Sequence, residues 1–369
     1  MPDPKQSFLL LFQATAILAV VAGVLAFVIY RQAGKGSLLP RSSAWNVQWS
    51  GWAVLVAFIA MIALPSLLQL ILDGSGFYHV LYGPDFPTGA DPNKLEEKQA
   101  SHLRALWSRT LAAPLIVFLL MMGIHQVFNA TSEQMGVSRK RLGSNIALGY
   151  VGWLIIAPLS FVLFAAAIVL LTPNPDKHPL MDLGPRAGEV EFVIFALQAA
   201  ICWPIVEELV FRGLLLAWLI QEPKSGTSSD VILQPRHRGH VCIAVGMLLS
   251  VQTPALTEAV KVQRWDQVLA NLGPFLFIAV LLPFYLFLPV SKWTRRRTGM
   301  ASPQTNQALF ASAIFFAAVH SSVWPTPIPL LLLGLGLGWL AIRTRSIVPS
   351  IVVHALFNGV AVIYQGFGS

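Results

Sequence analysis

The sequence predicts an all-α protein, a polytopic bundle of transmembrane helices with about eight to ten spans. Three observations predict this class. Apolar residues make up 55% of the 369 residues, charged residues make up only 11%, and the mean hydropathy is +0.66. Because an ordinary soluble domain has about 25% charged residues, this composition excludes a cytosolic enzyme, a disordered chain and a secreted protein held by disulfides.

Ten apolar segments approach the length of about 20 residues that a bilayer span requires. In chain order they are residues 8–30, 51–72, 110–129, 146–172, 191–220, 241–257, 272–290, 306–323, 328–342 and 346–364. The first has an apolar run too long for a signal peptide and no small-residue cleavage site, so we expect an anchor. Three glycines alternate along the ninth segment, and we interpret them as contacts for close helix packing.

The charge of the connecting loops alternates along the chain. One set, made of residues 31–50, 130–145, 221–240, 291–305 and 343–345, contains 15 Lys or Arg and 3 acidic residues, whereas the opposite set with both termini contains 9 and 12. Because basic loops stay in the cytoplasm, we place the first set there and both termini outside. The expected partner of these basic loops is the anionic surface of the lipid bilayer, and nothing in their pattern indicates nucleic acid.

Ionisable residues inside a span are the strongest pointers to function, because each costs about 2.5–3.5 kcal/mol on insertion scales. The fifth segment carries three of them, Glu207, Glu208 and Arg212. Glu208 and Arg212 are four residues apart, so they share a helix face and can pair. Such a pair could simply fix helix packing. Glu207 is turned by about 100° from Glu208 and therefore needs another partner or a role.

Two later segments add His320, and His354 with Asn358 one helical turn further on. A carboxylate beside an imidazole can take a proton from water. A second imidazole and a carboxamide can donate hydrogen bonds to a developing oxyanion. The same residues could instead hold Zn²⁺, with Glu207, His320 and His354 as ligands. The residues leave the two mechanisms open, and both predict a hydrolase.

Three motifs resemble those of the CAAX-processing and bacteriocin-processing intramembrane proteases, also called CPBP or Abi-like proteins, which include the type II CAAX prenyl endopeptidases. The family carries E-E-x-x-x-R, F-x-x-x-H and H-x-x-x-N on three membrane helices. This chain has, in the same order, Glu207-Glu208 with Arg212, Phe316 with His320, and His354 with Asn358. The resemblance covers about residues 190–222 and 306–360.

The resemblance implies a role for each matching residue. Glu207 would activate water with help from His320, and His354 and Asn358 would stabilise the oxyanion. Glu208 would support the site by pairing with Arg212, and the ring of Phe316 would line the site. The family has been described as metalloproteases, yet its site is also explained without a metal, so the expected cofactor is Zn²⁺ or none.

The chain departs from the family by its length. Between Arg212 and His320 lie 107 residues, and we expect an insertion over about 222–305 with two extra spans. Residues 1–190 form an N-terminal region of four spans without an assigned function, and residues 191–364 form the catalytic region.

We therefore expect an integral, multi-pass membrane protein, in the plasma (inner) membrane if the host is a bacterium. Its expected activity is that of an intramembrane endopeptidase acting on a membrane-associated, prenylated or otherwise lipidated protein or peptide. Two alternatives stay open at this point. The buried Glu and His residues also suit a proton or ion path in a transporter or channel, and the fold could serve as a catalytically silent scaffold.

Overall fold

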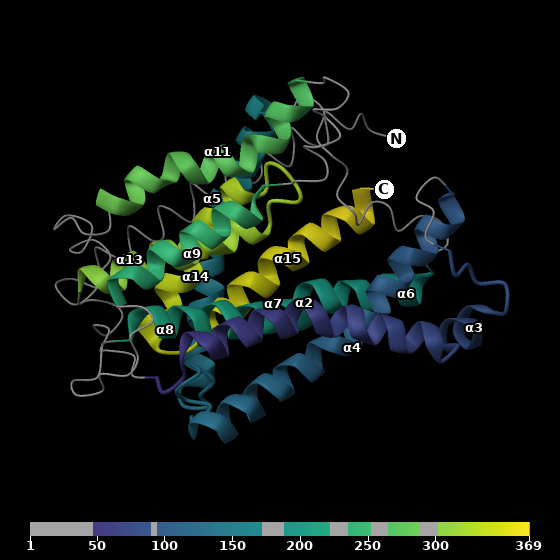
Figure 1. Cartoon of the computed structure of the whole chain (residues 1–369), viewed down its shortest axis with the longest axis horizontal. Coiled ribbons are helices and arrows are strands. Elements are labelled where there is room, and N and C mark those ends of the chain that lie inside the picture. The colour runs from purple at the N-terminus through teal and green to yellow at the C-terminus, as the bar shows by residue number, and fades with distance from the viewer. Residues whose placement is uncertain are drawn as a thin grey trace. The chain divides into compact units, whose positions relative to one another are not determined.

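The computed structural model (Figure 1) describes residues 47–89, 94–171, 188–221, 235–251, 265–287 and 302–368. The predicted first span, 8–30, lies outside the described residues, as do large parts of the segment 222–305. Every regular element in the described part of the chain is a helix, as the composition predicts.

The helices follow one another along the chain with π-helical segments, labelled η, inside one of them. Their bounds are α2 Gly51–Gly74, α3 Phe77–Tyr82, α4 Leu95–Phe128, α5 Leu142–Leu171, α6 Glu189–Leu197, η2 Gln198–Cys202, α7 Trp203–Glu208, η3 Leu209–Leu216, α8 Ala217–Ile220, α9 Pro235–Leu249, α11 Trp265–Phe287, α13 Pro303–Val319, α14 Pro327–Thr344 and α15 Val348–Gly368.

Five of these helices are long and apolar enough to cross a membrane, so the protein is an integral membrane protein. They cover Gly51–Gly74, Leu95–Phe128, Leu142–Leu171, Glu189–Ile220 and Pro327–Thr344, and two shorter apolar helices cover Asn271–Phe287 and Val348–Ile363. The predicted span 110–129 is the second half of α4, whose first half is the charged stretch after residue 94. The total of eight to ten spans stays a prediction.

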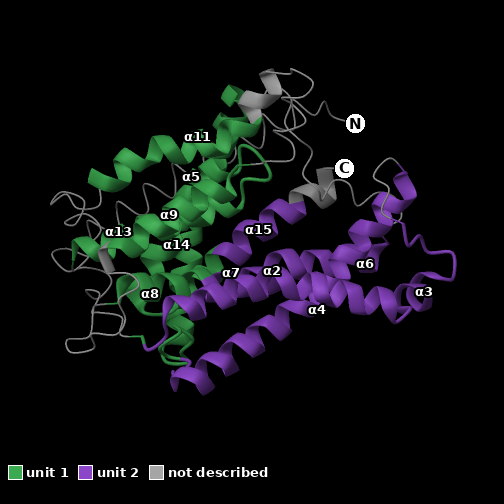
Figure 2. Ribbon diagram, in the orientation of Figure 1, with its two compact units in different colours: residues 1–47, 133–176, 211–353 green, residues 48–132, 177–210, 354–369 purple. Residues whose placement is uncertain are grey.

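The chain forms two compact units, which Figure 2 colours separately. Unit 1 consists of residues 1–47, 133–176 and 211–353, and unit 2 of residues 48–132, 177–210 and 354–369. The division passes through the helix at 189–220 and through α15. The linear boundary near residue 190 and the insertion at 222–305 stay predictions.

In unit 1, small residues allow the helices to approach closely, as the alternating glycines predict. A Cβ atom on Gly334 would lie 3.2 Å from Ala313 Cα of α13, and one on Gly336 would lie 2.6 Å from Ile156 Cδ1 of α5. Gly338 faces Leu309 of α13. Successive glycines therefore turn toward two neighbouring helices, and α14 packs against both.

Hydrogen bonds join loops that the charge pattern assigns to one side of the membrane. Ile347 N–H donates to Gly136 O at 2.9 Å, which ties the loop before α5 to the turn between α14 and α15. Gln221 Nε2 donates to Val47 O at 2.8 Å, which ties the chain before α2 to the end of α8. All four residues belong to unit 1, and the predicted alternation of loops across the membrane stays a prediction.

In unit 2, an aromatic cluster fixes α3 to the extramembrane end of α4. The Tyr78 hydroxyl donates to Arg104 O at 3.1 Å, and Trp107 Nε1 donates to the Tyr82 hydroxyl at 2.8 Å. Phe86 stacks on both tyrosines. Burial raises the pKa of each tyrosine to about 12, so both phenols are neutral and able to donate at physiological pH.

We expect Gly149→Ala to destabilise the protein by about 1–3 kcal/mol, the typical effect of overpacking. The added Cβ would lie 2.8 Å from the backbone oxygen of Pro349 and 2.6 Å from Val352 Cβ, so α5 and α15 must separate. Thermal unfolding in detergent measures the change. Gly123→Ala is the matched control, because nothing lies within 4 Å of the new Cβ there. Equal effects of the two substitutions would contradict the packing described for α5.

Candidate active site

Two buried glutamates follow each other on the helix at 189–220. Glu207 and Glu208 end α7, and 7% and 0% of their surfaces are exposed. Both carboxylates are therefore almost entirely removed from bulk water. Since an ionised group inside a span is stable only with partners nearby, the contacts of these two side chains decide what the site can do.

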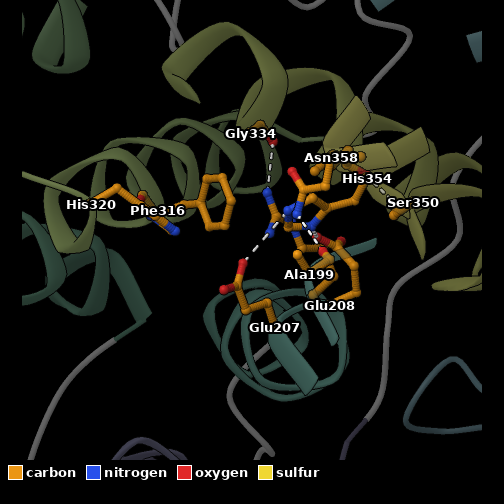
Figure 3. Close-up of polar contacts among 11 residues, drawn as sticks. Ala199, Glu207, Glu208, Phe316, His320, Gly334, Ser350, His354 and Asn358 are labelled. Atoms are coloured by element: carbon orange, nitrogen blue, oxygen red, sulfur yellow. Dashed lines mark hydrogen bonds and ion pairs between the residues drawn. The ribbon is translucent and has the colours of Figure 1, made fainter. Parts of the chain in front are cut away.

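The imidazole of His354 lies against both carboxylates (Figure 3). Its Nδ1 is 2.9 Å from Glu208 Oε1, and its Nε2 is 3.6 Å from Glu207 Oε2. An ionised carboxylate only accepts hydrogen bonds, so the contact with Glu208 places a proton on Nδ1. Glu208 thus fixes the orientation of the ring and directs Nε2 toward Glu207.

Asn358 lies one turn further along α15 and contacts the backbone of the same helix. Its Nδ2 donates to Ala199 O at 3.0 Å, and Ala199 belongs to the π segment η2 upstream of the glutamates. An amide nitrogen carries two hydrogens, and this bond uses one of them. The second hydrogen is therefore the one that suits an oxyanion.

Arg212 is buried in unit 1 by an aromatic ring and a backbone carbonyl. Its Nη2 lies 3.5 Å from Gly334 O, and its guanidinium carbon lies 4.3 Å from the centre of the Phe316 ring. A cation over an aromatic face is attracted by the ring electrons. Phe316 is itself fully buried and meets Phe211 edge-on. These contacts suit the supporting roles predicted for Arg212 and Phe316.

His320 is held by the end of its own helix. It is the residue that follows α13, and its Nδ1 lies 2.7 Å from Phe316 O. Because a carbonyl accepts hydrogen bonds, the proton of the neutral ring is on Nδ1 and Nε2 becomes the acceptor nitrogen. The ring also contacts Phe316, with 4.7 Å between ring centres. This arrangement gives His320 the tautomer that a proton acceptor needs.

The structure divides the predicted site residues into two groups. Glu207, Glu208, His354 and Asn358 contact one another or one helix within unit 2. Arg212, Phe316 and His320 contact one another within unit 1. The pairing of Glu208 with Arg212 and the assistance of Glu207 by His320 stay predictions.

No group of three or more His, Cys, Asp or Glu side chains in the described part of the chain is arranged to hold a metal ion. The three predicted zinc ligands are divided between the units, with Glu207 and His354 in unit 2 and His320 in unit 1, and zinc binding by this set stays a prediction. Of the three predicted ligands, His354 directs its two ring nitrogens at Glu208 and Glu207. As placed, these residues fit a proton-transfer chain, and the metalloprotease assignment stays a prediction.

Residues 189–360 match one protein family, described as type II CAAX prenyl endopeptidase Rce1-like. This segment belongs to that family. The matched range includes every residue predicted for the site. At the level of the family, this match supports a CAAX-type intramembrane protease, a hydrolase of peptide bonds. No curated protein and no solved structure matches the chain.

Reasoning from the sequence missed one partner in the site, the carbonyl of Ala199. Its bond to Asn358 joins residues 159 positions apart, and no local pattern encodes such a pairing. A partial signal exists in Pro204, because a proline inside a helix leaves a nearby carbonyl without its usual donor.

We expect His354→Leu to lower the free energy of unfolding by about 3 kcal/mol, because it leaves the fully buried Glu208 without the imidazole N–H. Combining His354→Leu with Glu208→Gln is expected to cost less than the sum of the two single effects. Thermal unfolding in detergent measures all three variants. His125→Leu is the control, since that ring is exposed and its Nδ1 bonds to its own helix end, at Ala130 O. Additive effects of the two site substitutions would contradict a direct contact.

Proposed function

We propose that this protein is an intramembrane endopeptidase in which Glu207 activates the attacking water. The observation that carries the proposal is the imidazole of His354 between two buried carboxylates, 2.9 Å from Glu208 and 3.6 Å from Glu207. A carboxylate and an imidazole held this close can exchange a proton without bulk water. The family match supports the same class of reaction.

In the proposed reaction, Glu207 takes one proton from water as the oxygen attacks the carbonyl carbon of the scissile peptide. The C–O bond forms, and the carbonyl π electrons move to the oxygen, which becomes an oxyanion. The C–N bond then breaks, and Glu207 returns the proton to the leaving nitrogen. The products are a carboxyl end and an amine, as the balance of peptide hydrolysis requires.

Two donors in unit 2 suit the oxyanion. In its doubly protonated form, His354 donates Nδ1–H to Glu208 and offers Nε2–H beside Glu207, where the attacked carbonyl would lie. Asn358 offers the amide hydrogen that Ala199 does not use. Fixed donors of this kind stabilise developing charge because they need no reorganisation during the reaction. Glu208 acts by orienting His354, as the carboxylate of a catalytic triad does.

The residues of unit 1 take supporting roles in the proposal. His320 assists Glu207 through Nε2, the nitrogen left as acceptor by the bond of Nδ1 to Phe316 O. Phe316 and Arg212 form a packed cation–π pair, and we propose that they wall the site. The proposed substrate is a membrane-associated or lipidated protein or peptide, because the helix that carries the two glutamates, at 189–220, is long and apolar enough to cross a membrane.

We expect Glu207→Gln to lower cleavage by about 100-fold or more, the usual contribution of a general base. The measurement compares new protein termini in native membranes that contain the wild type or the variant at matched abundance. Termini present only with the wild type would establish proteolysis and identify substrates. Identical termini, with both proteins folded, would contradict the proposal. If the variant instead lost a transport activity, that result would favour a transporter. If His354→Ala left the phenotype unchanged, that result would favour a catalytically silent scaffold.

We expect cleavage by the purified protein to persist after treatment with a strong zinc chelator, because the proposed steps use only side chains and water. The measurement is the rate of cleavage of a substrate peptide in liposomes, before and after chelation, with the zinc content of the protein determined in parallel. A loss of activity that added Zn²⁺ restores would contradict the proposed mechanism and favour zinc bound by Glu207, His320 and His354.

A further inference from the structure

The segment before the glutamates is wound as a π-helix, and the register of its hydrogen bonds follows from one backbone contact. Trp203 N–H bonds to Gln198 O, five residues earlier, instead of to the carbonyl four residues earlier. In the same register, the donor for Ala199 O would be the backbone nitrogen of residue 204. That residue is Pro204, which has no N–H.

Ala199 O therefore loses its donor within the helix for two reasons that act together. The π register assigns Trp203 N–H to Gln198, and the proline ring removes the next donor. A backbone carbonyl inside a membrane protein needs a partner from the protein, since lipid offers none. Asn358 Nδ2 lies 3.0 Å from this oxygen and supplies the hydrogen bond, as the close-up shows (Figure 3).

The same helix face of α15 holds the helix at 189–220 at two points. His354 contacts the carboxylates of Glu207 and Glu208, and Asn358, four residues later, contacts Ala199. The order is reversed along the two helices, as expected for antiparallel neighbours. Phe195 and Val362 continue the contact in a buried apolar cluster. All of these residues belong to unit 2.

We propose that Asn358 is a positioning residue that maintains the π register of Gln198–Cys202 and thereby aims the two glutamates at His354. A π segment adds one residue to a turn. If the segment relaxed to an ordinary α-helix, every later residue would rotate by about 100° around the axis. Glu207 and Glu208 end α7, the α-helical stretch that begins right after the segment, so that rotation would turn both carboxylates away from the imidazole. This inference rests on the proposed function of Glu207 and deepens it.

A role of Asn358 as oxyanion donor alone makes a different prediction. That role uses the second amide hydrogen and does not involve Pro204. The positioning role requires instead that Asn358 become less important once Ala199 O has another donor. Replacing Pro204 with Ala supplies that donor, because the new N–H lies one π turn after Ala199.

The experiment is a double-substitution cycle of Asn358→Leu and Pro204→Ala in the full-length protein. Leu is similar in size to Asn but donates no hydrogen bond. We expect Asn358→Leu alone to lower the unfolding temperature in detergent by a few degrees. Cleavage of a substrate identified from new termini should fall between about tenfold and a hundredfold, the effect of misplacing a reacting group by about 1 Å. The pH profile of kcat/KM should also shift, because Glu207 loses its fixed distance to His354.

In the double variant, we expect the unfolding temperature and the pH profile to return to the values of Pro204→Ala alone. The rate should recover only in part, because the leucine side chain still offers no hydrogen bond to the oxyanion, so the loss of rate from Asn358→Leu should be smaller in the Pro204→Ala background than in the wild type. A loss from Asn358→Leu that is equally large in the wild-type background and in the Pro204→Ala background would overturn the inference. The inference would also be overturned if the two substitutions were non-additive in unfolding temperature but additive in the rate and the pH profile. Asn358 would then be a purely structural contact. Asn145→Leu in α5 of unit 1 is the matched control, and its effect should add to that of Pro204→Ala.

The unfolding cycle separates this inference from the proposed function. Unfolding temperatures do not depend on proteolysis, so they test the contact between Asn358 and Ala199 even if the wild type cleaves nothing. A wild type without cleavage would overturn both the proposed function and the positioning role. A cleaving wild type with uncoupled variants would overturn the positioning role alone.

Discussion

The interaction on which the site depends is the contact of one imidazole with two buried carboxylates. Adjacent residues on a helix point about 100° apart, so Glu207 and Glu208 cannot present their side chains in the same direction. The two ring nitrogens of His354 lie on different edges of the imidazole, and a ring placed beside the helix can therefore meet both groups. Nδ1 contacts the carboxylate of Glu208, and Nε2 faces the carboxylate of Glu207. Because burying a carboxylate in a membrane helix is unfavourable unless polar groups lie nearby, the imidazole helps to stabilise both side chains where they lie. In the proposed reaction, the same contact orients the ring beside Glu207.

The helix that carries the glutamates departs from α geometry on both sides of them. The π segments η2 and η3 enclose the six residues of α7, and π segments inside α-helices are frequent at functional sites. Upstream, the irregular register leaves Ala199 O to be satisfied by α15. Downstream, η3 begins the stretch in which Arg212 is fully buried beneath Phe316. The helix is thus irregular on both sides of the six residues that end in Glu207 and Glu208.

Most of the helices could be predicted from the sequence, whereas the roles of the site residues stay predictions. The bounds predicted for α2, α5, α14 and the helix at 189–220 differ from the structure by a few residues, because the length of an apolar run measures a membrane span directly. The length of α4 was missed, since its first half is charged and gives no apolar signal. The π segments were missed because an apolar helix surrounded by lipid and protein has little periodicity to show a change of register. The partners of His354 and Asn358 lie 146 and 159 residues away, and such pairings depend on the packing of the whole unit.

The described helices between Arg212 and His320, α9 and α11, pack around α13 and the turn that follows it. A Cβ on Gly239 of α9 would lie 3.3 Å from Ala311 Cβ, and one on Gly246 would lie 3.1 Å from Ala318 Cβ. On α11, Gly273 packs against the ring of Trp324, four residues after His320. Two glycines thus let α9 approach the helix that ends at His320, and a third lets α11 approach the turn that follows. These elements lie with α13 in unit 1. Because α13 is buried along most of its length, displacing α9 would change the packing of the helix that ends just before His320, so α9 contributes to holding this residue.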